Sequence, residues 1–375
     1  MKHRLFLNMC QMPQTLKAIL CAALLCLGTA QPACARIQDV NPYNIRFLAG
    51  NGELSASAKI FFDNLTKLLR DMDAPMTLPE KKDFSNEAAW AEHVGQTCLL
   101  RARGKERWDI DSINRVQLAI QKEPERFFPL FQTLNMYLPV YPVQHSADAI
   151  LIYGATLEIM QERLAFLATL LNSTSVKDIF FLTGQRTLRE DEQQAAAELV
   201  KKLPLSEQKK PLYVNIKEEG KLAFLLVATS RLPESVKARI RIIYSGPAEG
   251  RDRATTASTL DSWLKTYRKP IKPFPKKIIA ISTNPFIAQQ HMALKNALSQ
   301  HQSDDDTFEV ETVGNTLAFK ALLPFYMPQP TKLKSVEQKV TADAGRAVLV
   351  LCDAVACALH EEFTHTPKTQ ADDKN

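Results

Sequence analysis

The arrangement of hydrophobic and polar residues changes near residue 143. Beyond that point, short apolar runs such as Ala147 to Tyr153 alternate with longer segments of helical periodicity. Apolar runs of this length are typical of strands buried on both faces, so the alternation predicts a parallel sheet with helices on both faces. The fold class that we predict for residues 143–362 is therefore α/β, a Rossmann-like domain. We expect strands at 147–153, 176–182, 239–244, 277–282 and 308–313, and helices at 157–171, 188–202, 256–267, 285–298 and 342–362. 

One segment of this half, residues 221–228, fits either a strand or a helix, and we expect a helix that ends near Pro233. The helix at 285–298 has a favourable start, because Asn284 can cap it and Pro285 fits its first turn. The tail at 363–375 is polar and is expected to be disordered.

Residues 36–142 show helical periodicity and predict an α-helical N-terminal region. A stripe from Ile60 to Leu69 has the spacing of one helix face. We expect Ser85 to cap a second helix, an aspartate at 109 or 111 to begin a third, and Pro124 to lie in the first turn of a fourth. Prolines at 139 and 142 then predict an extended linker to the α/β domain.

The first 35 residues have the organisation of a secretory signal peptide. Lysines and an arginine precede an apolar run at 18–28, and Ala33-Cys34-Ala35 has the small-x-small form of a cleavage site. The run is short for a bilayer span, so an uncleaved anchor fits less well, and Gln31 disfavours a lipoprotein signal at Cys34. We expect an exported protein on the periplasmic or cell-envelope side, with no membrane span after cleavage.

Cleavage would change both the charge and the cysteine content. It removes three unopposed cationic side chains and lowers the net charge from +6 to +3, a mild excess that does not indicate nucleic-acid binding. Four of the seven cysteines leave with the signal, and Cys98, Cys352 and Cys357 remain. One disulfide from Cys98 and three buried thiols are both compatible with this set.

Candidate site residues follow the predicted strands, because ligands of open α/β sheets bind beyond the carboxyl ends of the strands. Glycine there lets the backbone approach a ligand, and a following helix N-terminus attracts anions. Ordinary strand-to-helix turns explain the same residues, and more readily at Gly184 than at Gly154. The rule selects Gly154-Ala155-Thr156, Thr183-Gly184-Gln185 and Ser282-Thr283-Asn284.

A second group of candidates surrounds the predicted start of the helix at 256. Arg253 lies beside the hydroxyls of Thr255, Thr256 and Thr259, a set that suits an acidic or phosphorylated group. A helix cap with a solvated loop is the simpler interpretation of the same residues. Arg163, on the helix after the first strand, fits either a surface ion pair or the site.

Other catalytic signatures are missing from the sequence. No strand is followed by G-x-G-x-x-G, and there is no P-loop and no G-x-S-x-G. His360 and His365 are five residues apart rather than the four that a helical zinc site needs, and so are Cys352 and Cys357. We interpret His291 as a surface histidine. The residues indicate no particular cofactor.

Four segments in order resemble the YdcF/SanA/ElyC-like domain family of bacterial envelope-associated proteins. They are the first strand Asp148–Gly154, followed by Arg163 in its helix; Thr183-Gly184 at the second strand end; the threonine-rich Arg253–Thr259; and Thr283–Gln290, similar to the family's T-S-P-F-H-x-x-R segment. The resemblance covers somewhat under half the chain. It implies a Rossmann-like fold, an envelope setting and binding of a nucleotide-like ligand.

Three positions depart from the family pattern. Its histidine and its arginine in the last segment correspond to Ile287 and Gln290 here, and the asparagine often present in the threonine-rich helix corresponds to Ser262. We still expect Gln290 to line the ligand site. If those groups handle a phosphate or a proton in the family, this chain binds a different ligand or catalyses nothing.

Two functions therefore stay open. The first is a specific binder or catalyst for a small nucleotide-like or phosphorylated ligand of the cell envelope, which requires Arg163, Thr256 and Asn284 to converge near Gly154. The second is a non-catalytic envelope interaction protein with a degenerate site and a protein partner. Methyl transfer with S-adenosylmethionine rests on family analogy alone, and export argues against it because that cofactor is cytoplasmic.

Overall fold

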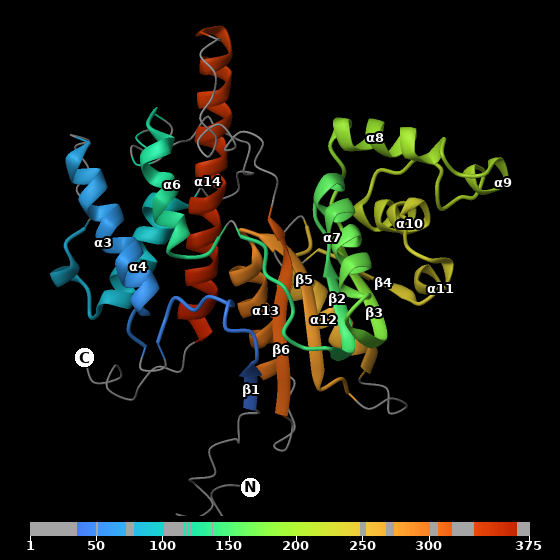
Figure 1. Ribbon diagram of the computed structural model, residues 1–375, viewed down its shortest axis with the longest axis horizontal. Helices are drawn as coiled ribbons and strands as arrows, with labels where there is room; N and C mark the ends of the chain where they lie inside the picture. Colours follow the sequence, from blue (N-terminus) through green and yellow to red (C-terminus); the bar gives the residue numbers. More distant parts are fainter. Residues whose placement is uncertain are drawn as a thin grey trace, which may run out of the picture.

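The computed structural model consists of a parallel sheet with helices on both faces and a group of helices packed at one side (Figure 1). The predicted signal peptide and most of the helix predicted after residue 109 lie outside the described residues. The structure describes residues 36–49, 52–72, 79–100, 116, 119, 122–136, 138–247, 253–267, 274–300, 307–316 and 334–365.

All six strands of the sheet run parallel, in the order β1-β6-β5-β2-β3-β4, which confirms the Rossmann-like α/β fold. All five predicted strands are present. Each central strand is nearly continuously buried, because helices cover both faces of the sheet. The strands are β1 (Arg36–Asp39), β2 (Ser146–Tyr153), β3 (Ser175–Gly184), β4 (Ile240–Ser245), β5 (Lys277–Asn284) and β6 (Thr307–Thr316).

The sixth strand, β1, corrects the prediction that residues 36–142 are helical from the start. Its four residues, RIQD, contain no apolar run and therefore give no strand signal. They pair in parallel with β6, from Arg36 opposite Thr307 to Asp39 opposite Val310. The free edge of β6 supplies the hydrogen-bonding groups that make this segment a strand.

Alternate residues of β2 show how the sheet is covered. Ile150 and Ile152 pack on one side with α7 (Leu157–Leu170) and α10 (Glu219–Thr229), and this confirms the helix expected at 221–228. Ala149 and Leu151 pack on the other side with α12 (Thr256–Tyr267) and α13 (Ile287–Ser299). The alternation follows from the two-residue period of a strand. Smaller helices beside α10 are α8 (Glu190–Val200), α9 (Leu205–Gln208) and α11 (Glu234–Lys237).

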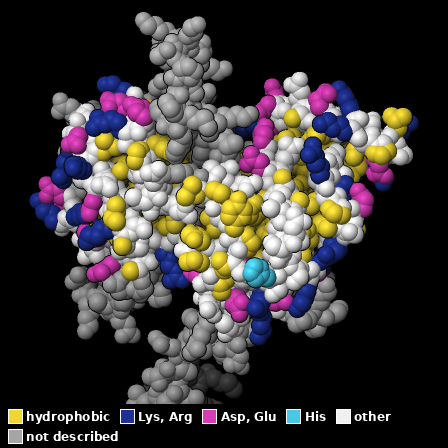
Figure 2. Space-filling model, in the orientation of Figure 1, with side chains coloured by type: hydrophobic (Ala, Val, Ile, Leu, Met, Phe, Trp, Pro, Cys, Tyr) yellow, Lys and Arg dark blue, Asp and Glu magenta, His cyan; other side chains and the backbone are white. Residues whose placement is uncertain are grey.

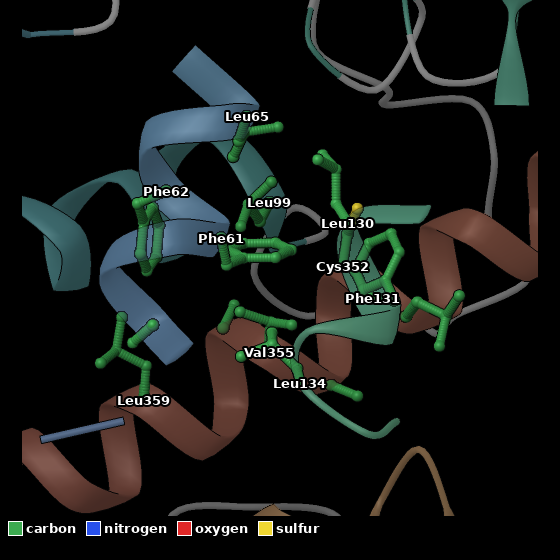
Figure 3. Close-up of a cluster of buried hydrophobic side chains, with 14 of the residues drawn as sticks. Phe61, Phe62, Leu65, Leu99, Leu130, Phe131, Leu134, Cys352, Val355 and Leu359 are labelled. Carbon is green, nitrogen blue, oxygen red and sulfur yellow. The ribbon is translucent and has the colours of Figure 1, made fainter. Parts of the chain in front are cut away.

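A separate apolar core joins the N-terminal helices to the C-terminal helix (Figure 3). Phe61 and Phe62 pack edge-on with ring centroids 5.2 Å apart, and Phe62 contacts Trp90 at 5.6 Å. Val355 and Leu359 of the C-terminal helix are fully buried in the same core. Its helices are α3 (Ala56–Asp71), η2 (Lys81–Asp83), α4 (Glu87–Val94), the π-helical turn η3 (Gly95–Leu99), α6 (Pro124–Gln132) and α14 (Lys334–His365).

Two predicted caps are wrong and one helix start is confirmed. The side chain of Asn86, not Ser85, accepts from the Ala89 amide at 2.8 Å and caps α4. Pro124 begins α6 as expected. Asn284 does not cap α13: its amide donates to the carbonyls of Asn135, at 2.9 Å, and Leu138, so it fastens the linker instead.

The direction in which successive strands are added to the sheet changes after β4. From β2 the chain builds outward through β3 to β4, and it then returns to place β5 and β6 on the other side of β2. The carboxyl ends of β2 and β5 therefore form the switch point at which ligands of such sheets bind. None of the described helices has the length and apolar character needed to cross a membrane.

Candidate functional site

A cavity of about 490 Å³ opens at this switch point, beyond the carboxyl ends of the strands. Such a volume is within the range of small-molecule sites. Its walls come from the ends of β2 and β3, from the N-terminal parts of α7, α12 and α13, and from α14. The lining residues are Tyr153, Gly154, Ala155, Thr156, Ile159, Arg163, Leu182, Gly184, Arg186, Glu219, Arg253, Ala254, Thr255, Thr256, Ala257, Thr259, Phe286, Gln289, Gln290, Cys357 and Glu361.

Arg163 forms the floor of the cavity and is not a surface residue. Only 1% of it is exposed. Its Nε donates to Thr283 Oγ1 at 3.0 Å, and its Nη1 donates to the carbonyls of Tyr153 and Gly154 at 2.7 and 3.0 Å. The guanidinium thus joins the end of β2 to the end of β5 across the switch point.

The charge of Arg163 is not neutralised by direct contact. Every hydrogen-bond acceptor that surrounds it is a neutral oxygen, and no carboxylate among the described residues forms an ion pair with it. Burial therefore lowers the pKa of Arg163 to about 10, although the more distant charge of Glu219 acts in the opposite direction. A buried cation in this environment favours a nearby anion.

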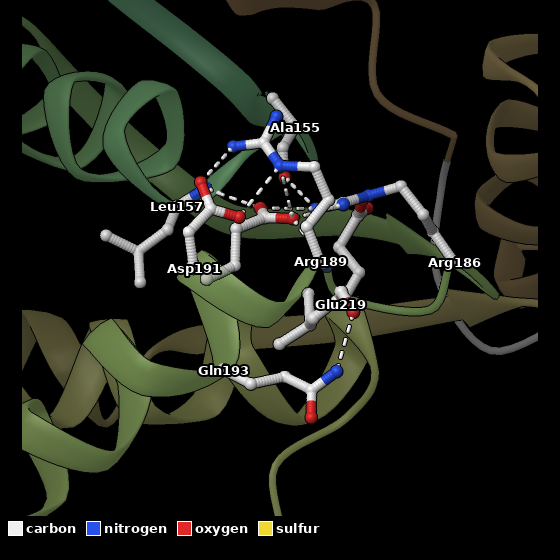
Figure 4. A network of polar contacts seen from close by, with 9 residues as sticks. Ala155, Leu157, Arg186, Arg189, Asp191, Gln193 and Glu219 are labelled. Carbon is white, nitrogen blue, oxygen red and sulfur yellow. Dashed lines mark hydrogen bonds and ion pairs between the residues drawn. The ribbon is translucent and has the colours of Figure 1, made fainter. Parts of the chain in front are cut away.

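Arg186, unlike Arg163, forms ion pairs with two carboxylates (Figure 4). Its Nη1 lies 2.7 Å from Glu192 Oε2 and its Nε lies 2.8 Å from Glu219 Oε2, while Nη2 also donates to the Ala155 carbonyl at 2.9 Å. Burial raises the pKa of Glu219, and the charges of Arg186 and Arg163 oppose that shift. The cluster connects the loops after β2 and β3 to the start of α10.

A side chain of the protein itself caps the N-terminus of α7. Glu192 Oε1 accepts from the Leu157 amide at 3.1 Å, so a carboxylate already caps the first turn of α7. At Gly154, an added Cβ would lie 2.1 Å from Glu219 Oε1. The glycine therefore accommodates an internal carboxylate, and the anion site expected at Gly154-Ala155-Thr156 is largely filled by protein groups.

The start of α12 faces the cavity and keeps hydrogen-bonding capacity. Thr255 Oγ1 accepts from the Ser258 amide at 3.1 Å, and Ser258 Oγ accepts from the Thr255 amide at 2.9 Å, which is a reciprocal cap. Thr259 Oγ1 donates to the Thr256 carbonyl oxygen at 2.8 Å. Among the described residues, none accepts from the Thr256 and Ala257 amides or bonds the Thr256 hydroxyl, and these groups lie beside Arg253 at the cavity.

Gln290 holds a defined orientation in the wall formed by α13. Its Oε1 accepts from Ser282 Oγ and, at 3.5 Å, from Arg163 Nη2. A guanidinium only donates hydrogen bonds, so the amide oxygen must face Arg163 and the amide nitrogen must point the other way. Ile287, in contrast, is 3% exposed and packs in the core with α7 and the sheet.

The prediction that His291 lies at the surface is wrong. It is 1% exposed, and its Nε2 and Nδ1 lie 2.9 Å from Asp39 Oδ1 and 3.1 Å from Thr312 Oγ1. Burial, with smaller effects from Lys295 and Arg46, lowers the pKa of His291 to about 3. The neutral imidazole joins α13 to β1 and β6, away from the cavity.

The structure brings together ten of the fifteen predicted site residues, and Gln185 and Ser282 are among the five that do not line the cavity. Thr183 is turned away and donates to the Ile243 carbonyl at 3.1 Å, Thr283 contacts the cavity only through Arg163, and Asn284 points to the linker. Of the three residues expected to converge near Gly154, Arg163 and Thr256 line the cavity and Asn284 does not. The ten are Gly154, Ala155, Thr156, Arg163, Gly184, Arg253, Thr255, Thr256, Thr259 and Gln290.

Sequence reasoning missed Arg186, Glu219 and the contribution of α14. Arg186 follows Thr183-Gly184 by two residues, so the strand-end rule could have included it. Glu219 is adjacent to no strand end, and Cys357 and Glu361 lie far along the chain. No local signal connects these three residues to the cavity.

The described residues hold no group of three or more His, Cys, Asp or Glu side chains placed to bind a metal ion. Cys98, Cys352 and Cys357 each carry a thiol. Burial raises the pKa of the Cys352 thiol, with a smaller effect from Asp353, so that thiol is not a nucleophile at neutral pH. Comparisons with family models, curated proteins and solved structures find no match to this chain.

Proposed function

We propose that this protein binds a small phosphorylated or nucleotide-like anion in the cavity at the carboxyl edge of its sheet. One observation carries the proposal: the floor of the cavity holds a buried guanidinium, Arg163, with neutral oxygens around it. Placing a cation out of water is costly unless an opposite charge compensates it. A bound phosphate would supply that charge at the place where the sheet topology favours a ligand.

The start of α12 adds a second reason to expect an anion. Thr256 and Ala257 present a hydroxyl and first-turn amides to the cavity, and Arg253 lies at the same rim. Backbone amides and the helix dipole at an N-terminus favour phosphate groups. Because Glu192 already caps α7, the anion is expected at α12 rather than at the loop after β2.

The setting that we propose is the cell envelope, and the relationship is to the YdcF/SanA/ElyC-like family. The organisation of the first 35 residues supports export. The four segments that resemble the family support the relationship, and all four contain residues that line the cavity.

Binding is a better supported function than acid–base catalysis. No histidine lies among the described lining residues, and the family's histidine position is held by the buried Ile287. Glu219 is engaged by Arg186 and by the Gly184 amide at 3.1 Å. The polar groups of the cavity are therefore arranged to hold a ligand.

Isothermal titration of the mature chain, residues 36–375, with pyrophosphate, adenosine monophosphate and glucose 1-phosphate tests the proposal. We expect a dissociation constant below about 1 mM for at least one of them, and about tenfold weaker binding or more in Arg163→Met. Thr256→Val, which removes one hydroxyl at nearly constant volume, should weaken binding by a smaller factor.

Arg231→Met is the matched control, because Arg231 is exposed and does not line the cavity. Circular dichroism and thermal unfolding check that Arg163→Met folds. If no phosphorylated compound binds, or if the folded Arg163→Met and Thr256→Val proteins bind as tightly as the control, the proposal is wrong.

A second candidate is an interaction protein that docks a partner, and a surface feature favours it. Leu138, Tyr141 and Val143 in the linker before β2 are 55%, 57% and 43% exposed. Apolar side chains gather over the central part of the face shown in Figure 2, between more charged flanks. Exposed apolar patches mark interaction sites. Loss of partner co-purification in a Leu138→Ser/Tyr141→Ser double variant with intact ligand binding would support this role.

A further inference from the structure

The cavity has two chemically different walls. The wall formed by α12 is cationic and rich in hydroxyl and amide donors, with Arg253, Thr256 and Ala257. A second wall, from α13 and α14, has side-chain amides and a carboxylate, Gln289, Gln290 and Glu361. A simple inorganic anion would be recognised by the first wall alone, so the second wall calls for a ligand with further polar groups.

Gln290 presents a defined donor to that ligand. The residue is 9% exposed, and its oxygen is held by Ser282 and Arg163. Its Nε2 donates to none of the described residues, and the side chain lines the cavity. This amide nitrogen is therefore open to an acceptor on a ligand in the cavity.

Glu361 presents an acceptor on the same side. Its Oε2 accepts from the Asn296 amide at 3.4 Å, and its Oε1 accepts from none of the described residues. Cys357 lies one helical turn earlier, so this face of α14 is directed at the cavity. A carboxylate on this wall disfavours a second phosphate at this end and favours hydrogen-bond donors.

A donor and an acceptor on one wall match hydroxyl groups, which can both donate and accept, better than they match an ammonium group, which only donates. We propose that the ligand is a sugar phosphate, whose phosphate lies against the start of α12 and Arg163 and whose hydroxyls lie against Gln290 and Glu361. This inference rests on the proposed function, and it adds the class of ligand and its orientation.

Titration calorimetry of the mature chain with orthophosphate, glucose 1-phosphate, ribose 5-phosphate and phosphoethanolamine tests the inference. We expect at least one of the two sugar phosphates to bind about tenfold more tightly than orthophosphate and phosphoethanolamine. Glu361→Gln should remove most of that advantage while leaving orthophosphate binding within about twofold. Glu198→Gln on α8, where Glu198 is exposed and pairs with Lys201, is the matched control and should behave as wild type.

The outcomes separate the two proposals. If orthophosphate binds and neither sugar phosphate binds more tightly, the ligand class is wrong and the anion site stands. Tighter binding of phosphoethanolamine than of both sugars, or an unchanged sugar preference in Glu361→Gln, also overturns the inference. If none of the four compounds binds, both proposals fail for these ligands.

Discussion

Gly154 must lack a side chain because a carboxylate fills the adjoining space. A Cβ there would lie 2.1 Å from Glu219 Oε1 and 2.8 Å from the Leu182 carbonyl oxygen. At the same scale, Arg163 and His291 are both buried, and the surroundings of each decide its protonation state. Arg163 remains a cation among neutral oxygens, whereas His291 is neutral between Asp39 and Thr312.

Substitution Gly154→Ala should lower the free energy of unfolding by about 1–3 kcal/mol, because the backbone or Glu219 must move. Gly246→Ala is the control, since a Cβ at Gly246 meets nothing within 4 Å. Its effect should stay below about 1 kcal/mol. Urea unfolding of the two variants measures the difference, and equal effects would contradict the close contact at Gly154.

Because His291 is neutral in the folded protein, we expect the free energy of unfolding to decrease at acidic pH. In the unfolded chain the imidazole takes up a proton below its ordinary pKa of 6.5, whereas in the folded protein its pKa is about 3. The stability from this group is therefore complete above pH 6.5 and is lost as the pH falls towards 3, by at most about 1.4 kcal/mol per pH unit.

Urea unfolding at several pH values between 7 and 4 measures this loss, with His291→Gln as the test variant and His145→Gln, at an exposed position, as the control. The glutamine cannot titrate, so its stability should fall less steeply than that of the wild type. Asp39, Lys295 and Arg46 face the imidazole in every variant, and their contribution is common to the comparison. Parallel curves for wild type and His291→Gln would refute the prediction.

Among the elements, α7 and α8 depend on one carboxylate for their starts. Glu192 accepts from the Leu157 amide at the start of α7 and from the Arg189 amide at the start of α8, and its side chain is fully buried. Burial alone would raise the pKa of Glu192, but its contacts with Arg186 and the two amides outweigh burial and lower it. The first turns of these helices are thereby connected.

Substitution Glu192→Gln should destabilise the protein by about 3 kcal/mol, because it leaves part of the Arg186 charge buried without its partner. Glu198→Gln on the same helix should change stability by less than about 0.5 kcal/mol, since its pair with Lys201 is exposed. Thermal and urea unfolding compare the two. A similar small effect in both would mean that the Arg186 cluster is not a structural support.

Across the whole molecule, α14 connects the N-terminal helices to the sheet. It supplies Val355 and Leu359 to the helical core, packs against α13, and places Cys357 and Glu361 at the cavity. Phe286, at the start of α13, belongs to the same core. The C-terminal helix therefore lines the cavity and, through its core contacts, connects it to the N-terminal helices.

Substitution Leu359→Ala should lower the free energy of unfolding by about 2–5 kcal/mol, because the leucine is fully buried. Unfolding should remain one transition, since α14 contacts both parts of the molecule. Leu205→Ala, at a position that is 77% exposed, should change stability by less than about 0.5 kcal/mol. Calorimetry that shows two separate transitions, only one of them shifted, would contradict this coupling.

Much of the α/β fold could be predicted because it is encoded locally. The strands β2, β3 and β5 each contain a continuous apolar run, and a strand covered on both faces needs no more than that. Gly154, Ala155, Thr156 and Gly184 line the cavity because they lie at strand ends, which meet at one edge of any parallel sheet. The same rule misplaced Asn284, since a nearby loop offered its carbonyls to the side chain.

The sequence by itself therefore determined the alternation of strands and helices and the edge of the sheet at which the cavity lies. Only the tertiary structure decided that the RIQD segment is a strand, that His291 is buried, and that Glu219 and Glu361 lie at the cavity. These features depend on contacts between residues far apart in the chain, such as β1 with β6 and α14 with α13. Hydrophobic periodicity describes only the local environment of each residue, so it carries no information about those partners.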